Sequence, residues 1–138
     1  MTSTTDRVTL PDQAKAWLDD KLFATIATIN PDGQPQLSVV WVTRDGDDVI
    51  VSTTTNRRKY RNLVRDPRAT VLVSPPDAPY TYVEIQGTVT LENEGSMATI
   101  DALAKLYRDW DRYPADDGTD NVRIDIRLTP TKVVLRTP

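Results

Sequence analysis

A hydroxyl-rich turn followed by cations is the part of the sequence best suited to chemistry. Ser52 and Thr53 end an expected strand, and the first turn of an expected helix then carries Arg57, Arg58 and Lys59. Free backbone N–H groups, hydroxyls and guanidinium groups at such a junction together meet the requirements of a phosphate site. The alternative interpretation of the same residues is a solvated, charged helix face.

The net charge of the 138 residues is −3, but the charge is distributed unevenly. From Arg57 to Arg68 the chain has six Lys or Arg residues and one Asp, a local charge of +5, so the remaining residues carry −8. An acidic protein is poorly suited to general binding of nucleic acid, so no nucleic-acid partner is expected. A short basic segment instead suits a small anionic ligand, which it attracts over about 8–10 Å.

The sequence contains no cysteine and no histidine. This excludes disulfides, thiol nucleophiles, zinc sites of the usual Cys and His ligands, and every mechanism that uses a histidine base. Chemistry must then come from oxygen nucleophiles, carboxylates, Lys or Arg bases, or a bound cofactor, and no metal site is expected. The five glycines are scattered, so neither a Rossmann fingerprint nor a P-loop can form.

Targeting and membrane signals are missing from the sequence. No stretch approaches the ~20 apolar residues of a membrane span, and residues 1–8 lack the basic and then apolar pattern of a signal peptide. The absence of cysteine agrees with a reducing compartment. A cytoplasmic protein without a membrane partner is therefore expected.

The elements around the basic segment are predicted to be mainly strands. Strands are expected over residues 23–29, 36–43, 49–53, 70–73, 80–92, 122–128 and 132–135, and helices over 10–21, 57–66 and 96–110, the last capped by Ser96. The first three strands are expected to form an antiparallel meander, and Gly87 to mark a bulge or bend. Many short antiparallel strands favour a small barrel, which removes exposed sheet edges. We expect one mainly β domain over residues 1–138, with an N-terminal helix at about 10–21 and the barrel at about 22–136.

Four segments together resemble a known family. They are Ala24-Thr25-Ile26, the hairpin from Asp32 to Ser38, the basic segment from Asn56 to Ala69 that ends in Arg-Asp-Pro-Arg-Ala, and the strand from Glu84 to Val89. In order and spacing they resemble the pyridoxamine 5′-phosphate oxidase-like flavin and deazaflavin oxidoreductases, over roughly residues 18–135. Within that superfamily the chain is most similar to the actinobacterial branch, whose members use the deazaflavin coenzyme F420 in place of FMN.

The resemblance implies a split β-barrel that forms a homodimer, with two cofactor sites between the subunits. It implies an F420-dependent reductase that transfers a hydride between the reduced deazaflavin and a small unsaturated organic substrate. The cofactor carries the hydride, so no catalytic side chain is implied. The surplus cations Arg61 and Arg65 are expected to receive the oligoglutamate tail of F420.

The resemblance also assigns roles to particular residues. Arg57 and Lys59, with Arg58 nearby, match the phosphate-binding cations, and Ser52 and Thr53 match the strand end that flanks the phosphate and ribityl chain. The residues that match the stretch lining the ring are Gln36, Ser38, Val39 and Val40. Tyr80 and Tyr82 fall near the open face of the ring and are candidates for the substrate pocket.

Alternatives remain for the function and for several residues. One is an FMN-dependent oxidase or reductase on the same barrel, and another is a non-catalytic protein that binds a flavin or F420. Val39 and Val40 are equally compatible with core or interface positions. The tryptophans Trp17, Trp41 and Trp110 are more typical of a core, and the acidic residues of the 114–121 loop, Asp116 among them, are more typical of a solvated surface.

Overall fold

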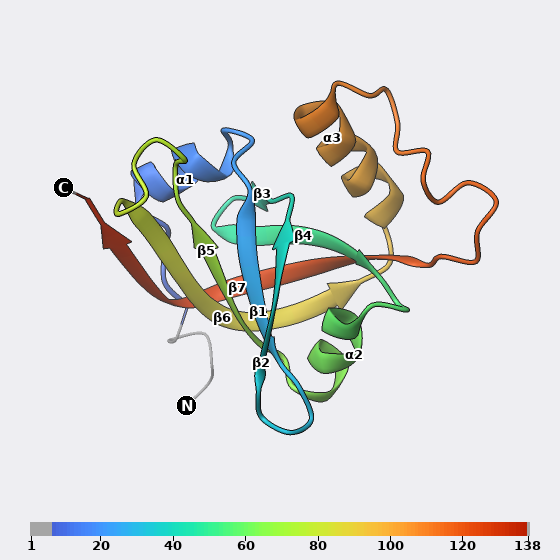
Figure 1. The fold of residues 1–138 in the computed structure, drawn as a ribbon, viewed down its shortest axis with the longest axis horizontal. Helices are drawn as coiled ribbons and strands as arrows, with labels where there is room; N and C mark the ends of the chain where they lie inside the picture. Colours follow the sequence, from blue (N-terminus) through green and yellow to red (C-terminus); the bar gives the residue numbers. More distant parts are fainter. Residues whose placement is uncertain (1–6, 138) are drawn as a thin grey trace.

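The computed structural model describes residues 7–137, which form one antiparallel sheet with three helices around it (Figure 1). The strands are β1 (Ala24–Ile29), β2 (Pro35–Val40), β3 (Thr43–Asp45), β4 (Asp48–Thr54), β5 (Arg68–Val73), β6 (Tyr82–Glu92) and β7 (Arg123–Arg136). The helices are α1 (Asp12–Leu18), α2 (Arg58–Arg65) and α3 (Ser96–Arg108). The mainly β architecture predicted from the sequence is confirmed.

The sheet curls into a barrel that is not closed. The strand order is β2-β1-β5-β6-β7-β4-β3, so β2 and β3 form opposite edges of the sheet. Only Trp41 and Val42 separate these two strands in the chain, and two residues cannot span a flat seven-stranded sheet. The sheet must therefore bend until its edges meet, and because β2 and β3 are not hydrogen-bonded to each other, the barrel is split at this point.

Both antiparallel pairings of the predicted meander are present, but they do not share one continuous middle strand. β2 pairs with β1, whereas β4 pairs with β3 and β7 on the other side of the barrel. The predicted strand over residues 36–43 is in fact two strands, because the chain crosses the split between Val40 and Thr43. Local alternation cannot reveal this crossing, because β-branched and aromatic residues suit both sides of it.

The last two predicted strands form one continuous strand, β7. Gln86 of β6 pairs with Lys132, and the next residue, Gly87, pairs with Pro130, so Thr131 is an extra residue on β7. The irregularity predicted at Gly87 is thus present, although the inserted residue lies on the partner strand. Such a bulge accommodates Pro130, which has no N–H to give to the ladder.

The core fills the barrel from alternating strand positions. Fully buried side chains of this set are Ile26, Val49, Val51, Val71, Val73, Val83, Ile85, Ile126 and Leu128. Helix α1 covers one end with Ala14, Trp17 and Leu18, so Trp17 is a core residue as predicted. This helix is shorter than the predicted range of residues 10–21, since Pro11 stands before its first residue and Lys21 has a φ of 42°.

Helix α3 lies beside β4 and β7 and is anchored at both ends (Figure 1). Its N-cap is Gly95, with a φ of 81°, rather than the predicted Ser96, whose hydroxyl instead donates to the carbonyl oxygen of Arg123 at 2.9 Å. The helix ends at Arg108, so Trp110 lies beyond it and outside the buried core, with the Arg108 guanidinium 4.6 Å from its ring centre.

Tyr107 at the end of α3 connects the helix to the split. Its hydroxyl lies 2.6 Å from the carbonyl oxygen of Leu22 and 2.9 Å from that of Val42, and it accepts the Val42 N–H at 3.1 Å. Val42 is fully buried, so these groups have no solvent to replace the hydroxyl. Burial raises the pKa of Tyr107, which keeps the phenol protonated near neutral pH.

Removing this hydroxyl is expected to loosen the split. We expect Tyr107→Phe to lower the free energy of unfolding by about 1–3 kcal/mol, because a buried N–H and a carbonyl lose their partner. Urea unfolding followed by circular dichroism measures this change. Tyr80→Phe is the matched control because Tyr80 is 89% exposed, and a similar loss in both variants would contradict the bridging role.

Candidate functional site

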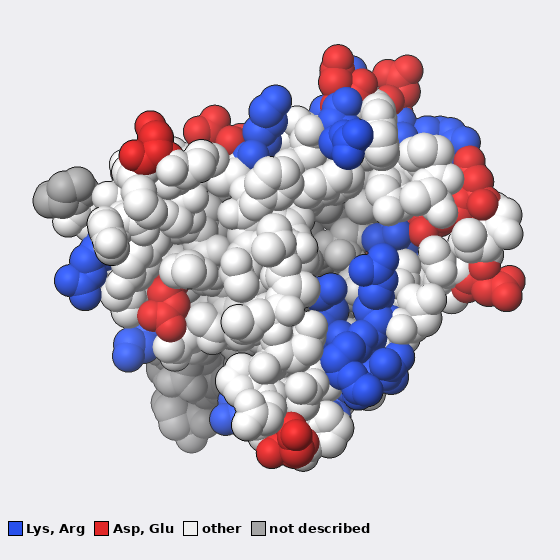
Figure 2. All heavy atoms as spheres, viewed as in Figure 1, with Lys and Arg blue, Asp and Glu red and all other residues white. Residues whose placement is uncertain are grey.

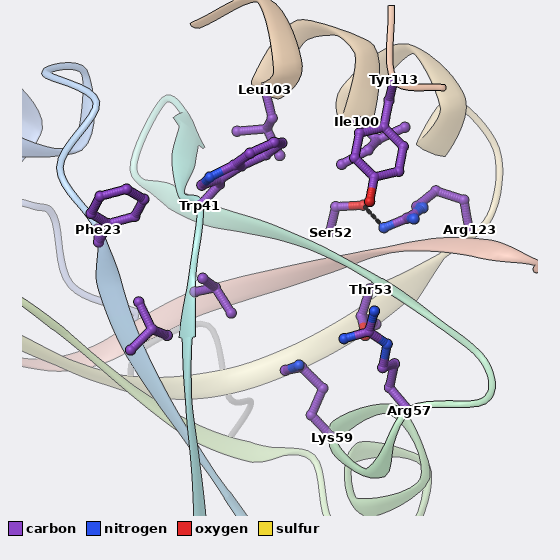
Figure 3. A pocket seen from close by; sticks show the side chains of 12 residues that line it. Phe23, Trp41, Ser52, Thr53, Arg57, Lys59, Ile100, Leu103, Tyr113 and Arg123 are labelled. Carbon is purple, nitrogen blue, oxygen red and sulfur yellow. Dashed lines mark hydrogen bonds between the residues drawn. The ribbon is translucent and has the colours of Figure 1, made fainter. Parts of the chain in front are cut away.

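A cavity of about 280 Å³ opens between α2, α3 and the split of the barrel (Figure 3). Six residues that the sequence assigns to the cofactor site line it: Val39, Val40, Ser52, Thr53, Arg57 and Lys59. These residues come from β2, β4 and the start of α2, so elements far apart in the sheet order meet here because the sheet curls. The structure thus brings together most of the assigned residues in one place.

Five assigned residues do not line this cavity. Gln36 accepts a hydrogen bond from Thr28 at 3.1 Å, and the Ser38 hydroxyl is buried with no hydrogen-bond partner among the described residues. Arg58 is exposed on the first turn of α2. Tyr80 lies in the β5–β6 loop and Tyr82 begins β6, on the side of the molecule opposite α2 (Figure 1). The roles given to these residues therefore stay predictions.

The packing of helix α2 against the barrel determines which of its cations point into the cavity. Its buried face carries Lys59, Asn62 and Leu63. The Asn62 amide donates to the Thr28 hydroxyl and to the side-chain oxygen of Asn30, both at 3.0 Å, and so holds the helix against β1. This contact turns Lys59 into the cavity, where Figure 3 shows its side chain near that of Arg57. Figure 2 shows Lys and Arg side chains gathered over α2 beside a hollow in this face.

Lys59 is a buried cation without an acidic partner in the described chain. Only 8% of the residue is exposed, and neither Lys59 nor Arg57 forms an ion pair within residues 7–137. Burial, and then the neighbouring Arg57, lower the pKa of Lys59. An isolated buried charge is costly, and an anionic group in the cavity would offset that cost.

Two hydroxyls from β4 complete this end of the cavity. The Thr53 hydroxyl is buried and has no hydrogen-bond partner among the described residues, and Ser52 accepts a hydrogen bond from Arg123 at 3.3 Å. With Arg57 and Lys59, the unused donor of Thr53 forms a set that fits a group with several anionic oxygens. We call Arg57, Lys59 and Thr53 the anion end of the cavity.

The opposite wall is aromatic and apolar. Trp41 stacks on Tyr107 with ring centres 5.4 Å apart, and meets Tyr113 edge-on at 6.2 Å. The lining residues that the sequence assigned no role in the site are Phe23, Trp41, Ile100, Leu103, Tyr113 and Arg123. Trp41, predicted as a core residue, lies in this wall because it stands at the crossing between β2 and β3. No pattern in the sequence marks that crossing.

Arg123 and Asp116 form a buried ion pair beside the aromatic wall. The side chains are 8% and 9% exposed, with Nε to Oδ2 at 3.0 Å and Nη2 to Oδ1 at 2.9 Å. The guanidinium also lies 5.0 Å from the ring centre of Tyr113. Arg123 holds the pKa of Asp116 below its usual range. The prediction that Asp116 lies on a solvated surface is therefore wrong, because its loop folds back onto β7.

Neither a membrane-spanning helix nor a metal cluster occurs in the described part of the chain. Every helix within residues 7–137 is too short or too polar to cross a bilayer. The same residues contain no group of three or more Asp or Glu side chains placed to hold a metal ion.

The split barrel, with its cationic and aromatic cavity, belongs to a protein of the flavin or deazaflavin oxidoreductase type, as comparison with known proteins indicates. The family model of pyridoxamine 5′-phosphate oxidase matches residues 10–135. Because this match covers most of the chain, the protein belongs to the pyridoxamine 5′-phosphate oxidase family.

Solved structures with the same fold support this placement. An F420 reductase is 32% identical, with a TM-score of 0.78, over 91% of this chain and 98% of its own. A conserved hypothetical protein from Mycobacterium tuberculosis is 23% identical with a TM-score of 0.74, over 96% and 88%. General stress protein 26 from Bacillus anthracis is 13% identical with a TM-score of 0.66, over 88% and 89%. The last two similarities concern the fold alone.

Proposed function

We propose that the protein is a reductase that uses coenzyme F420 and transfers a hydride to a small unsaturated organic substrate. The observation that carries this proposal is the buried Lys59 beside Arg57, without an acidic partner within residues 7–137 and facing an aromatic wall in one cavity. The 32% identity to an F420 reductase favours the deazaflavin over FMN. When bound, F420 supplies the hydride, and the protein supplies binding and orientation.

The residues of the cavity divide these tasks. Arg57, Lys59 and the Thr53 hydroxyl hold the phosphate, each with a donor that has no acceptor in the described chain. Val39 and Val40 lie against the ring and exclude water from one of its faces. We further propose that Arg61 and Arg65 receive the anionic tail, since both are exposed on α2.

A second copy of the chain is proposed to complete the site. A cavity of about 280 Å³ lies below the ~300–1,000 Å³ usual for pockets that enclose a drug-sized ligand. Val39 lines the cavity and yet is 69% exposed, so the wall continues onto the outer face of β2. The register places Val39, Thr25 and Leu72 in one row across β2, β1 and β5. With the exposed Leu37 beside it, this row forms an apolar patch that suits a homodimer interface.

The dimer is tested by placing a charge in this patch. We expect Leu37→Asp to weaken dimerisation by roughly a hundredfold or more, because two-fold symmetry buries the new carboxylate twice. Analytical ultracentrifugation measures the change, and cofactor affinity should fall with it. Val64→Asp is the control, since Val64 is 62% exposed but lies on α2. A Leu37→Asp protein with unchanged dimerisation would place the interface elsewhere.

The cofactor is tested by titrating the purified protein with F420 and, in parallel, with FMN. Tight binding of F420 and weak binding of FMN is the expected result, followed by oxidation of reduced F420 when unsaturated acceptors are added. A preference for FMN would place the protein among the flavin-dependent oxidases and reductases. Binding of F420 without turnover would favour a non-catalytic binding protein, and binding of neither cofactor would refute the proposal.

A further inference from the structure

The cavity contacts three cations, and a single carboxylate in the described chain pairs with one of them. Arg57 and Lys59 belong to the anion end. Arg123 lies at the opposite end of the cavity and is bound by Asp116 (Figure 3). We call this opposite end the α3 end; its lining residues are Trp41, Ile100, Leu103, Tyr113 and Arg123. We propose that Asp116 determines the charge preference of the α3 end: by neutralising Arg123 it suits this end to an uncharged planar ring and leaves anion binding to Arg57 and Lys59. The inference deepens the proposed function, because it names the class of ligand accepted beside the cofactor.

The geometry fixes Arg123 as part of the wall. Two of its guanidinium nitrogens contact the two carboxylate oxygens of Asp116, and the third, Nη1, donates to Ser52. Tyr113 lies over the guanidinium, and the Asn121 amide donates to Asp116 at 2.9 Å. With its side chain held on all these sides, Arg123 cannot turn toward a ligand without losing a buried ion pair.

Neutralisation changes what the α3 end attracts. A bidentate carboxylate cancels the charge of the guanidinium locally, and the remaining lining there is Trp41, Tyr113, Ile100 and Leu103. Aromatic rings in offset or edge-on contact suit a flat ligand. A carboxylate on such a ligand would lose water and find no free cation at this end, so the uncharged form should bind better.

The experiment compares two ligands of the same shape and different charge. Naphthalene-2-carboxamide and naphthalene-2-carboxylate are titrated calorimetrically, with inorganic phosphate present to occupy the anion end. The wild-type protein should prefer the carboxamide. In Asp116→Asn, which keeps the shape and frees the charge of Arg123, the carboxylate should gain roughly tenfold or more in affinity, while the carboxamide should change less than about threefold.

Matched variants localise the effect. Asp117→Asn removes the same charge from the neighbouring residue, which pairs with Arg112 on the exposed side of the loop, and should cause no gain. The gain should also vanish in the double variant Asp116→Asn/Arg123→Gln. In the reverse change, Arg123→Gln alone should improve binding of the cationic probe 2-naphthylmethylamine. The single variant Arg123→Gln keeps the inference testable if Asp116→Asn does not fold.

Two results would overturn the inference: a wild-type preference for the carboxylate, or a folded Asp116→Asn protein with unchanged affinities for both naphthalenes. Titration with F420 and FMN separates this failure from failure of the proposed function. If neither cofactor binds but Asp116→Asn reverses the charge preference, the proposed function fails and the role of Asp116 stands. If F420 binds and the preference does not change, only the role of Asp116 fails.

Discussion

Replacing Lys59 by methionine is expected to weaken cofactor binding by about 1.5–3 kcal/mol, a factor of about 10–100, while leaving the fold intact. The ammonium of Lys59 is turned into the cavity and has no acidic partner in the described chain, so a bound phosphate is its natural counter-charge. Methionine keeps most of the side-chain length and removes only the charge. Fluorescence titration with F420, and with FMN, measures the loss.

The same substitution is expected to stabilise the free protein at neutral pH. The pKa of Lys59 is lowered from its ordinary 10.5, first by burial and then by Arg57. The folded state thus binds this proton less readily than the unfolded chain, which makes stability rise with pH through the interval between the two pKa values. The loss of stability caused by the buried charge is fully present below the pKa that Lys59 has in the folded protein. It disappears above 10.5, the pKa of Lys59 in the unfolded chain. Cofactor affinity should fall as the pH rises through that same interval in the wild-type protein and not in Lys59→Met.

Lys105→Met is the matched control for both effects. Lys105 pairs with Asp109 on the exposed surface of α3 and does not touch the cavity. Its replacement should leave cofactor affinity unchanged and should not stabilise the protein. Wild-type affinity in Lys59→Met would remove Lys59 from the cofactor site and with it the observation that carries the proposed function.

The sequence predicts the parts of this molecule that depend on local patterns. Alternation predicts most of the strands, and the basic run with its Asp-Pro end predicts α2, because these signals act over a few residues. The sequence also predicts that one site contains Ser52, Thr53, Arg57 and Lys59, because a strand end and the first turn of a helix are adjacent in the chain. These four residues lie together in the structure.

Features that depend on how the sheet curls were outside the reach of the sequence. The pairing of β4 with β7 joins residues 69 to 79 positions apart, so neither the break in the middle strand of the meander nor the place of Trp41 is visible locally. The ion pair of Arg123 and Asp116 spans only seven positions, but it needs the acidic loop to fold back. Acidic loop residues are usually solvated, which is why the composition of this loop misled the prediction.

Gly87→Ala is expected to be the most destabilising single change in the barrel, costing about 3 kcal/mol or more. A Cβ at this position would lie 2.1 Å from the carbonyl oxygen of Thr129 and 2.9 Å from Cδ2 of Leu128. The first of these atoms belongs to the backbone of β7, so no side-chain rotation can relieve the contact. Glycine is required here for close approach of the two strands.

The strands cannot easily separate to make room, because β6 pairs with β7 along its full length, from Tyr82 to Glu92. A shift of β7 would also move Arg123, which belongs to the same strand and lines the cavity, so cofactor affinity should fall together with stability. Urea unfolding measures the stability, and Thr88→Ala, at an exposed neighbouring position, should cost less than about 1 kcal/mol. A Gly87→Ala protein that unfolds at the wild-type urea concentration would mean that β6 and β7 do not approach each other this closely.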